Sequence, residues 1–198
     1  MNVHTQTIEL YAKQLRTPTF NHYEDIIRQL GPDRGYEDFL VALMKMELDS
    51  RMESSQRRRI RAAGFPYIKT MDELDFSRFE HINEAFIGEL ASCDFVSKRQ
   101  NIVMIGNPGT GKSHLSIALG IKACMQGINV KFYTAANLSN ELIEAQEYKK
   151  LLRLERQIAK AELLIIDELS YLTFNGRVEV RLSTLRSRFV FSVALRFL

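Results

Sequence analysis

Cysteine is scarce in this sequence, and long apolar runs are absent from it. The 198 residues include two cysteines, Cys93 and Cys124, which are too few for a disulfide framework. Neither belongs to a Cys-x-x-Cys pair or to a cluster with histidine, so we expect no zinc site. No stretch approaches the roughly 18 consecutive apolar residues of a membrane-spanning helix. The first residues also lack the basic and then apolar pattern of a secretory signal. These absences predict a cytoplasmic protein in a reducing compartment, with no membrane partner.

The composition is that of an ordinary globular chain. With 45% hydrophobic and 26% charged residues it excludes general disorder, and its length suffices for one compact domain with a smaller helical appendage. The net charge of +3 is small but unevenly distributed. Residues 51–69 hold six basic groups against one acid, and residues 175–198 hold five arginines against one glutamate. Any polyanionic partner is therefore expected to meet local basic patches.

The first part of the chain predicts helices. Segments 5–15 and 36–62 read as helices, the second on apolar residues at roughly helical spacing, and the turn signal Gly31-Pro32-Asp33 separates them. We therefore expect a small N-terminal helical domain over residues 1–62, which could bind DNA or a partner. Residues 63–100 are expected to form a lead-in segment with one or two helices at about 79–92.

From residue 101 the pattern changes to strands that alternate with helices. Apolar runs of strand length occupy 101–106, 129–135 and 162–167, and we expect the first and the third of them to be buried. Between them, helical segments run from 111 to 126 and from a cap at Asn137 or Ser139 to about Lys160. This alternation predicts an α/β fold whose parallel sheet is covered by helices on both faces.

A glycine-rich motif follows the first predicted strand. Residues 106–113 match the pattern Gly-x-x-x-x-Gly-Lys-Ser/Thr at every fixed position. Glycine lets the backbone turn tightly with its N–H groups toward a phosphate chain, and the following helix adds the positive end of its dipole. Lys112 can reach the β- and γ-phosphates, and the Ser113 hydroxyl can ligate Mg²⁺. A mere connecting turn would not explain these two residues. The predicted nucleotide-binding residues are Gly106, Asn107, Pro108, Gly109, Thr110, Gly111, Lys112, Ser113 and His114, the last with a mainly structural role.

Two acids end the third predicted strand. Asp167 and Glu168 follow four apolar residues and fall at the carboxyl edge, where open α/β sheets bind their ligands. Asp167 could hold Mg²⁺ through water, and Glu168 could orient and deprotonate an attacking water. A strand that simply ends in solvent is the alternative, but a position 55 residues after Lys112 favours the site. We predict Mg²⁺-dependent hydrolysis of ATP, with Lys112 and Glu168 catalytic and Ser113 and Asp167 at the metal.

Several separate segments carry a family resemblance. GNPGTGKSHLSIALGIKA (106–123), VKFYTAANLSNEL (130–142) and LLIIDELSYLTFN (163–175) resemble the IstB-like transposition helper ATPases, and AGFPYIKTMDELDF (63–76) resembles the stretch that leads into their core. This family belongs to the AAA+ class and is related to helicase loaders of the DnaC type and to the initiator DnaA. The resemblance implies a P-loop ATPase core over 101–175 and a homo-oligomer on double-stranded DNA. It also implies that the protein recruits or stimulates an IstA-like transposase.

Two other functions stay open beside this one. A DnaC-like loader would depend on a replicative helicase instead of a transposase. A remnant of the family would bind nucleotide and DNA without hydrolysis. ATP turnover separates the remnant from both ATPases.

The basic tail at 176–198 departs from the family pattern. After residues 172–175 the likeness ends, lysine and aspartate disappear, and the chain stops 31 residues after Asp167. This switch suggests a frameshift, and it predicts that the last core strands, the sensor residues, the arginine finger and the helical lid are missing. A divergent but functional tail is the alternative. RFVFSVALRFL (188–198) could form a strand or an amphipathic helix, to which we assign no role.

Two basic sets are candidates for DNA contact. Arg57, Arg58, Arg59 and Arg61 form the densest run, for which a solvated helix end is the plain alternative. Lys149, Arg153, Arg156 and Lys160 are spaced to line one face of a helix, opposite Leu151, Leu154 and Ile158, which we expect to be buried. Nearby glutamates equally allow a salt-bridged surface there. In the lead-in, Phe65 and Tyr67 are expected to pack in the core or near an adenine.

Overall fold

The computed structural model describes residues 3–31, 35–75, 84–107, 109–168 and 190–195. These residues belong to two compact units, Met1–Arg57 and Arg58–Leu198, which are described separately below. Pro108 of the predicted phosphate loop, residues 32–34 of the predicted turn and most of the predicted tail lie outside the described residues.

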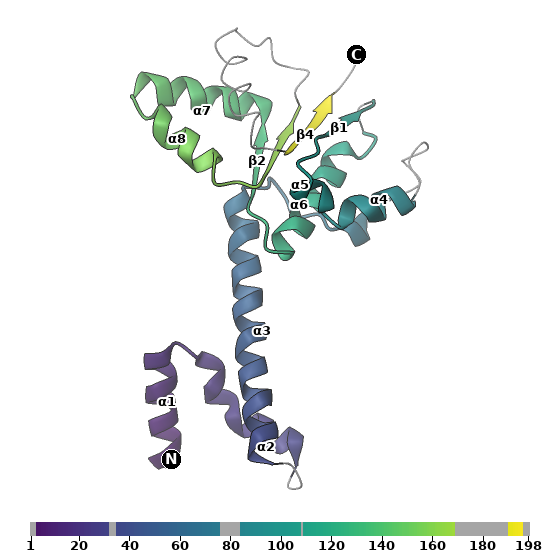
Figure 1. Ribbon diagram of the computed structural model, residues 1–198. Coiled ribbons are helices and arrows are strands. Elements are labelled where there is room, and N and C mark those ends of the chain that lie inside the picture. Colours follow the sequence, from purple (N-terminus) through teal and green to yellow (C-terminus); the bar gives the residue numbers. More distant parts are fainter. Residues whose placement is uncertain (1–2, 32–34, 76–83, 108, 169–189, 196–198) are drawn as a thin grey trace. The chain divides into compact units, whose positions relative to one another are not determined.

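The N-terminal unit is helical, as predicted. Its elements are α1 (Val3–Leu15), the short 3₁₀ helix η1 (Pro18–His22), α2 (Tyr23–Leu30) and the greater part of α3 (Tyr36–Ala63) (Figure 1). The sequence patterns anticipated α1 and α3 but not the two elements between them.

A buried glutamate ties this unit together. Glu47 of α3 is 7% exposed and accepts a hydrogen bond of 2.5 Å from the Thr19 hydroxyl of η1. Its other carboxylate oxygen accepts a bond of 2.6 Å from Arg51 Nε, and Arg51 also donates to the carbonyl oxygen of Arg16. Burial alone would raise the pKa of Glu47, but the bonds from Thr19 and Arg51 and the charge of Arg51 outweigh it and lower the pKa. The carboxylate therefore connects η1, α3 and the end of α1.

The second unit carries the sheet and its covering helices. After the C-terminal end of α3 its helices are η2 (Met71–Glu73), α4 (Glu84–Ala91), α5 (Asp94–Ser97), α6 (Lys112–Met125), α7 (Ala135–Glu147) and α8 (Leu151–Ile158). Its strands are β1 (Ile102–Ile105), β2 (Val130–Thr134), β3 (Leu163–Asp167) and β4 (Val190–Leu195). The strands are parallel and lie in the order β1-β4-β3-β2.

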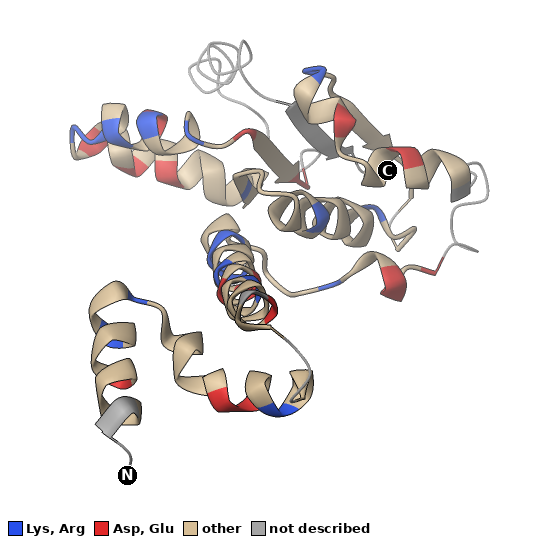
Figure 2. Ribbon diagram, turned by 60° about the horizontal axis from the view of Figure 1, so that its bottom comes forward, with Lys and Arg blue, Asp and Glu red and all other residues tan. Residues whose placement is uncertain are grey.

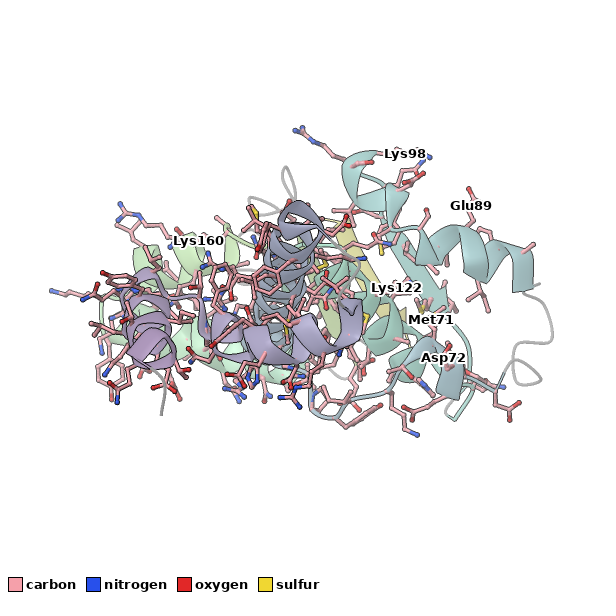
Figure 3. All side chains as sticks on the ribbon, turned by 90° about the horizontal axis from the view of Figure 1, so that it is seen from below. Met71, Asp72, Glu89, Lys98, Lys122 and Lys160 are labelled. Atoms are coloured by element: carbon pink, nitrogen blue, oxygen red, sulfur yellow. The ribbon has the colours of Figure 1, made fainter. Side chains whose placement is uncertain are left out.

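Helices cover both faces of this sheet, as the sequence predicted (Figure 1). The clearest evidence is β3, in which all five residues are buried. Leu163 and Ile165 pack in a core with α6, whereas Leu164 and Ile166 pack in a second core with α7 and α8. The lead-in segment joins the α6 side, where η2, labelled at Met71 and Asp72 in Figure 3, lies against α6.

Strand β4 comes from the basic tail. It lies between β1 and β3, and its residues pair in register with Ile102–Ile105 on one side and Leu163–Ile166 on the other. We expected core strands to be missing from this part of the chain. The structure nevertheless contains a strand at Val190–Leu195, one of the two conformations that we considered for residues 188–198.

Two expectations about the core elements are wrong. The run at β1 is not buried, because β1 is an edge strand of the described sheet, and Val103 and Ile105 are 54% and 61% exposed. The helix expected up to Lys160 is two helices, and its cap is Thr134, whose hydroxyl accepts the N–H of Asn137 at 3.2 Å. In the part of the chain that the structure describes, no helix is long and apolar enough to cross a membrane.

Candidate nucleotide-binding site

The loop between β1 and α6 has the backbone geometry that the motif requires. Gly109 and Gly111 have φ angles of 79° and 90°, in the left-handed region that side chains other than glycine rarely adopt. Gly111 is the N-cap of α6, so the loop leads directly into the N-terminal end of that helix. The helix therefore directs its unpaired N–H groups and its positive dipole end toward the loop.

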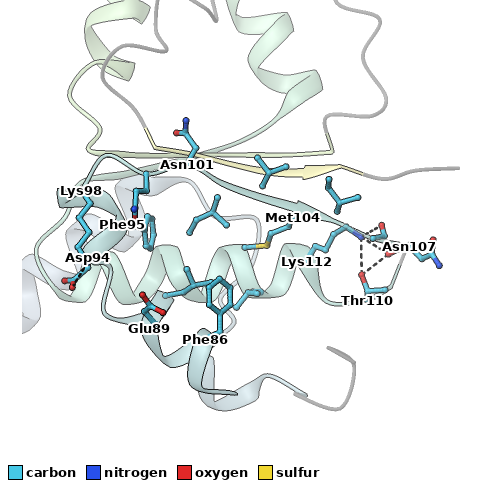
Figure 4. A pocket seen from close by; sticks show the side chains of 17 residues that line it. Phe86, Glu89, Asp94, Phe95, Lys98, Asn101, Met104, Asn107, Thr110 and Lys112 are labelled. Carbon is cyan, nitrogen blue, oxygen red and sulfur yellow. Dashed lines mark hydrogen bonds and ion pairs between the residues drawn. The ribbon is translucent and has the colours of Figure 1, made fainter. Parts of the chain in front are cut away.

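Lys112 is the first residue of α6, and its ammonium group lies over the loop. Its Nζ donates to the carbonyl oxygens of Gly106 and Asn107 at 2.7 and 2.6 Å and to the Thr110 hydroxyl at 3.2 Å (Figure 4). The Thr110 hydroxyl in turn donates to the carbonyl oxygen of Asn107 at 2.9 Å. The loop's own oxygen atoms thus hold the lysine charge in place.

The two predicted acids lie at the carboxyl end of β3, as the sequence indicated. Asp167 is the last strand residue and is 7% exposed, and its Oδ1 accepts the backbone N–H of Glu168 at 3.0 Å. Glu168 is exposed and has a φ of 61°, which is unusual for a glutamate. Glu168 is therefore accessible beside the buried Asp167.

A pocket of about 220 Å³ joins the loop to these acids. It is lined by Tyr67, Gly109, Thr110, Gly111, Lys112, Ser113, His114, Asp167 and Glu168. The structure therefore brings together residues that lie 55 positions apart in the sequence, as predicted from the motif spacing. Gly106 and Asn107 lie outside this pocket and contact Lys112 instead.

His114 lines the pocket and also contacts the lead-in segment. Its Nε2 lies 3.2 Å from the carbonyl oxygen of Thr70, which belongs to the lead-in segment. The bond joins α6, one residue after Ser113, to the start of η2.

Tyr67 is the pocket residue that the sequence reasoning did not place at the phosphate loop. Burial and the negative charge of Asp167 raise the pKa of the Tyr67 phenol above its ordinary value. The phenol therefore stays protonated at neutral pH and can donate a hydrogen bond. The sequence signal for it was weak, because one tyrosine in a connecting segment has many structural explanations.

The pocket suits a magnesium nucleotide better than a bare metal ion. Among the described residues, no group of three or more His, Cys, Asp or Glu side chains could hold a metal. Mg²⁺ is usually held by one or two carboxylates together with substrate phosphates and water. Asp167 and the Ser113 hydroxyl, which line one pocket, supply this kind of incomplete ligand set.

A larger groove of about 1090 Å³ runs along the exposed edge of β1 (Figure 4). Phe86, Leu90, Phe95 and Met104 give it an apolar lining, and Lys112 lies at one end. The smaller pocket is the better site candidate, because it alone combines the loop with both acids.

The first basic set lies near the end of α3, and its four members differ. Arg57 forms an exposed ion pair of 3.5 Å with Glu53. Arg58 and Arg61 are exposed, whereas Arg59 is half-buried, near the turn at Gly127. The predicted basic run is therefore only partly available to a ligand in solution.

The second basic set does not form the continuous stripe that we expected. Lys149 has a φ of 53° in the turn after α7, and Lys160 lies in the turn after α8. Only Arg153 and Arg156 lie on α8, with Glu155 between them in the sequence. Figure 2 shows basic and acidic positions together on α7 and α8. Leu154 and Ile158 are buried, as expected, and Leu151 is half-buried against the same core. The predicted single face was wrong because the helix breaks at residues 148–150.

The parallel sheet, with a phosphate loop after β1 and acids at the end of β3, defines a P-loop NTPase fold of the AAA+ class. The ATP analogue-bound DnaA of Aquifex aeolicus matches the fold with a TM-score of 0.59 at 18% identity, over 66% of this chain and 42% of DnaA. At this identity the match concerns the fold alone.

Sequence comparison identifies the family within this class. The sequence model of the family of IstB-like ATP-binding proteins matches residues 12–188, and the chain belongs to this family. The match continues beyond residue 175, where we expected the likeness to end.

Two relatives show the extent of the similarity. The ATP-binding protein of insertion sequence IS21 from Pseudomonas aeruginosa is 34% identical over 155 residues, which are 78% of this chain and 58% of that protein. The ATP-binding protein of IS5376 from Geobacillus stearothermophilus is 36% identical over 137 residues, 69% of this chain and 55% of that protein. The names of both relatives give ATP binding as an inferred function. The chain thus spans little more than half the length of these relatives.

Proposed function

We propose that this chain binds ATP with Mg²⁺ in the pocket between the phosphate loop and β3, and that it hydrolyses ATP there. The observation that supports this most directly is the pocket itself, which holds Lys112, Ser113, Asp167 and Glu168 together. These four side chains cover the needs of phosphoryl transfer, namely phosphate binding, metal ligation and orientation of water.

Each residue has a part in the proposed reaction. Lys112 exchanges its bonds to the loop oxygens for bonds to phosphate oxygens, and the N-terminal end of α6 adds to the binding of the negative charge. Ser113 and Asp167 hold Mg²⁺, which when bound neutralises charge on the terminal phosphates. Glu168, exposed at the pocket, accepts a proton from the attacking water and orients it.

Binding and turnover of ATP test the proposal separately. Lys112→Ala is expected to lower ATP affinity about 10- to 100-fold, because hydrogen bonds to charged groups are lost. Lys122→Ala, also on α6 but in its last turn (Figure 3), is the matched control and should bind ATP normally.

Glu168→Gln should retain ATP binding and lose roughly 10²- to 10⁴-fold in turnover. Normal ATP affinity in Lys112→Ala would contradict the proposed site. Binding without turnover in the unchanged chain would favour the non-hydrolysing remnant.

We further propose that the chain acts on duplex DNA as a helper of insertion-sequence transposition, as an oligomer that recruits a transposase. Support comes from its membership of a family whose relatives are named for insertion sequences, and from the exposed arginines of α3 and α8.

The test compares Arg58→Glu/Arg61→Glu with Arg153→Glu/Arg156→Glu in DNA binding at several salt concentrations. Loss of phosphate contacts should weaken binding and reduce its salt dependence. Unchanged binding in both variants would refute these contacts. Co-purification with a replicative helicase instead of a transposase would favour a loader.

A further inference from the structure

Within the second unit, the lead-in segment contacts α6 on both sides of Tyr67. On the N-terminal side, Phe65 packs in the core, with its ring centroid 6.0 Å from that of Phe132. It also lies directly over Gly120 of α6, where a built Cβ atom would come within 2.8 Å of the ring. Phe65 is therefore held by the close approach of a helix that has no side chain at this point.

On the C-terminal side, the attachment is the bond between Thr70 and His114. The carbonyl oxygen of Thr70 lies 3.2 Å from His114 Nε2, and Glu73 accepts the Thr70 hydroxyl hydrogen at 3.3 Å. Met71 packs against a core that contains Leu115 of α6. Since His114 follows Ser113, this attachment is made directly beside the phosphate loop.

Tyr67 lies between these two attachments and lines the pocket with the loop and both acids. Tyr67 is 46% exposed, so it is accessible to a ligand in the pocket. The pocket also holds both acids, so Tyr67 shares the side of the site where β3 ends. That side is the one at which we propose the metal and the terminal phosphate, not the base.

We propose that Tyr67 is a nucleotide-contacting residue whose hydroxyl donates a hydrogen bond to the terminal phosphate of ATP, so that the site distinguishes ATP from ADP. This inference rests on the proposed function, since it requires nucleotide in this pocket. A phenol suits the role because it adds a donor without adding a second positive charge beside Lys112.

The first test is the affinity of Tyr67→Phe for different nucleotides, measured by calorimetry. ATP affinity is expected to fall about five- to tenfold, because a hydrogen bond to a charged oxygen is lost at a partly exposed site. ADP affinity should stay within about twofold, and the ratio of ATP to GTP affinity should not change. Equal losses for ATP and ADP would overturn the proposal, because they would mark a structural role or a contact with another part of the nucleotide.

The second test uses the absence of tryptophan from the sequence. Tyr67→Trp introduces one fluorophore into the pocket, and Tyr148→Trp, 69% exposed in the turn after α7, is the matched control. ATP should change the emission of Tyr67→Trp more than ADP does, and neither nucleotide should change that of Tyr148→Trp. Equal responses to ATP and ADP at position 67 would overturn the contact with the terminal phosphate.

The two proposals fail in different ways. If the unchanged chain does not bind ATP, or if Lys112→Ala binds ATP as tightly as the unchanged chain, the proposed function itself is wrong. If binding depends on Lys112 but Tyr67→Phe keeps the ATP to ADP ratio, only the role of Tyr67 is wrong.

Discussion

Gly120 offers a sharp test of how the lead-in segment packs on α6. Substitution by alanine would place a Cβ atom 2.7 Å from Ile165 Cδ1 and 2.8 Å from two atoms of the Phe65 ring. Carbon atoms in contact normally lie about 3.5–4.0 Å apart, so the ring and the isoleucine must both move. We expect an overpacking cost of about 1–3 kcal/mol, partly offset by the helix preference of alanine over glycine, about 1 kcal/mol.

Gly88 is the matched control for this substitution. It also lies within a helix, α4, but apart from the helix's own backbone no described residue lies within 4 Å of a Cβ atom built there. Gly88→Ala should therefore be neutral or stabilising, by up to about 1 kcal/mol. The difference between the two variants removes the helix preference and leaves the overpacking cost, about 1–3 kcal/mol.

Urea unfolding followed by far-ultraviolet circular dichroism measures both free energies. A double variant, Gly120→Ala/Phe65→Leu, should lose less free energy of unfolding than the two single substitutions added together. The smaller side chain at position 65 makes room for the added methyl group. If Gly120→Ala is as stable as Gly88→Ala, Phe65 does not pack on α6 as described. The placement of Tyr67, two residues away, would then lose its main support.

Three further predictions concern other parts of the chain. The lowered pKa of Glu47 means that its contribution to stability is present above the ordinary carboxyl pKa of 4.5 and is lost as the pH falls through the folded value. Glu47→Gln should flatten this dependence and cost about 1–3 kcal/mol at neutral pH, measured by thermal unfolding across pH. Burial raises the pKa of Cys124 to about 11, so a thiol reagent should label it at neutral pH only on unfolding, and rapid labelling of the folded chain would contradict this. Lys149→Gly should stabilise the second unit by about 1 kcal/mol, because glycine tolerates the left-handed φ of 53°, and an unchanged urea midpoint would refute it.

The regular elements were predictable where local pattern and tertiary setting agree. The apolar run of β3 predicted a strand buried on both faces, and both sides are covered by helices. The break after α7 was not predictable, because it lacks the glycine that usually marks such an end. Lys150 N–H donates to Ala145 at 2.7 Å and Lys149 N–H to Gln146 at 3.3 Å, a Schellman ending with lysine at the left-handed position. The sequence pattern did indicate the burial of Leu154 and Ile158, but not the turn that precedes them.

The candidate site was predictable in its motifs but not in its surroundings. The loop at 106–113 and the acids after β3 follow from residue types that phosphate and Mg²⁺ require. Tyr67 was not assigned to the phosphate loop, because its position depends on where Phe65 and Thr70 attach. These attachments join residues 67 and 44 positions apart in the sequence, and neither has a sequence signature.

Strand β4 gives the strongest argument that part of the tail belongs to the fold. Every described pairing between the loop strand β1 and the acid-bearing strand β3 passes through it. Neighbouring strands lie about 4.8 Å apart, so β4 sets the ends of β1 and β3 about 10 Å apart, a separation that leaves room for phosphates and a metal ion.

A chain that stops after residue 189 keeps every motif residue but lacks this spacer. We expect it to lose ATP affinity to the level of Lys112→Ala, measured by calorimetry on the folded fraction. Full affinity in the shortened chain would show that the loop and the acids come together without β4, and the sheet order would then have no part in forming the pocket.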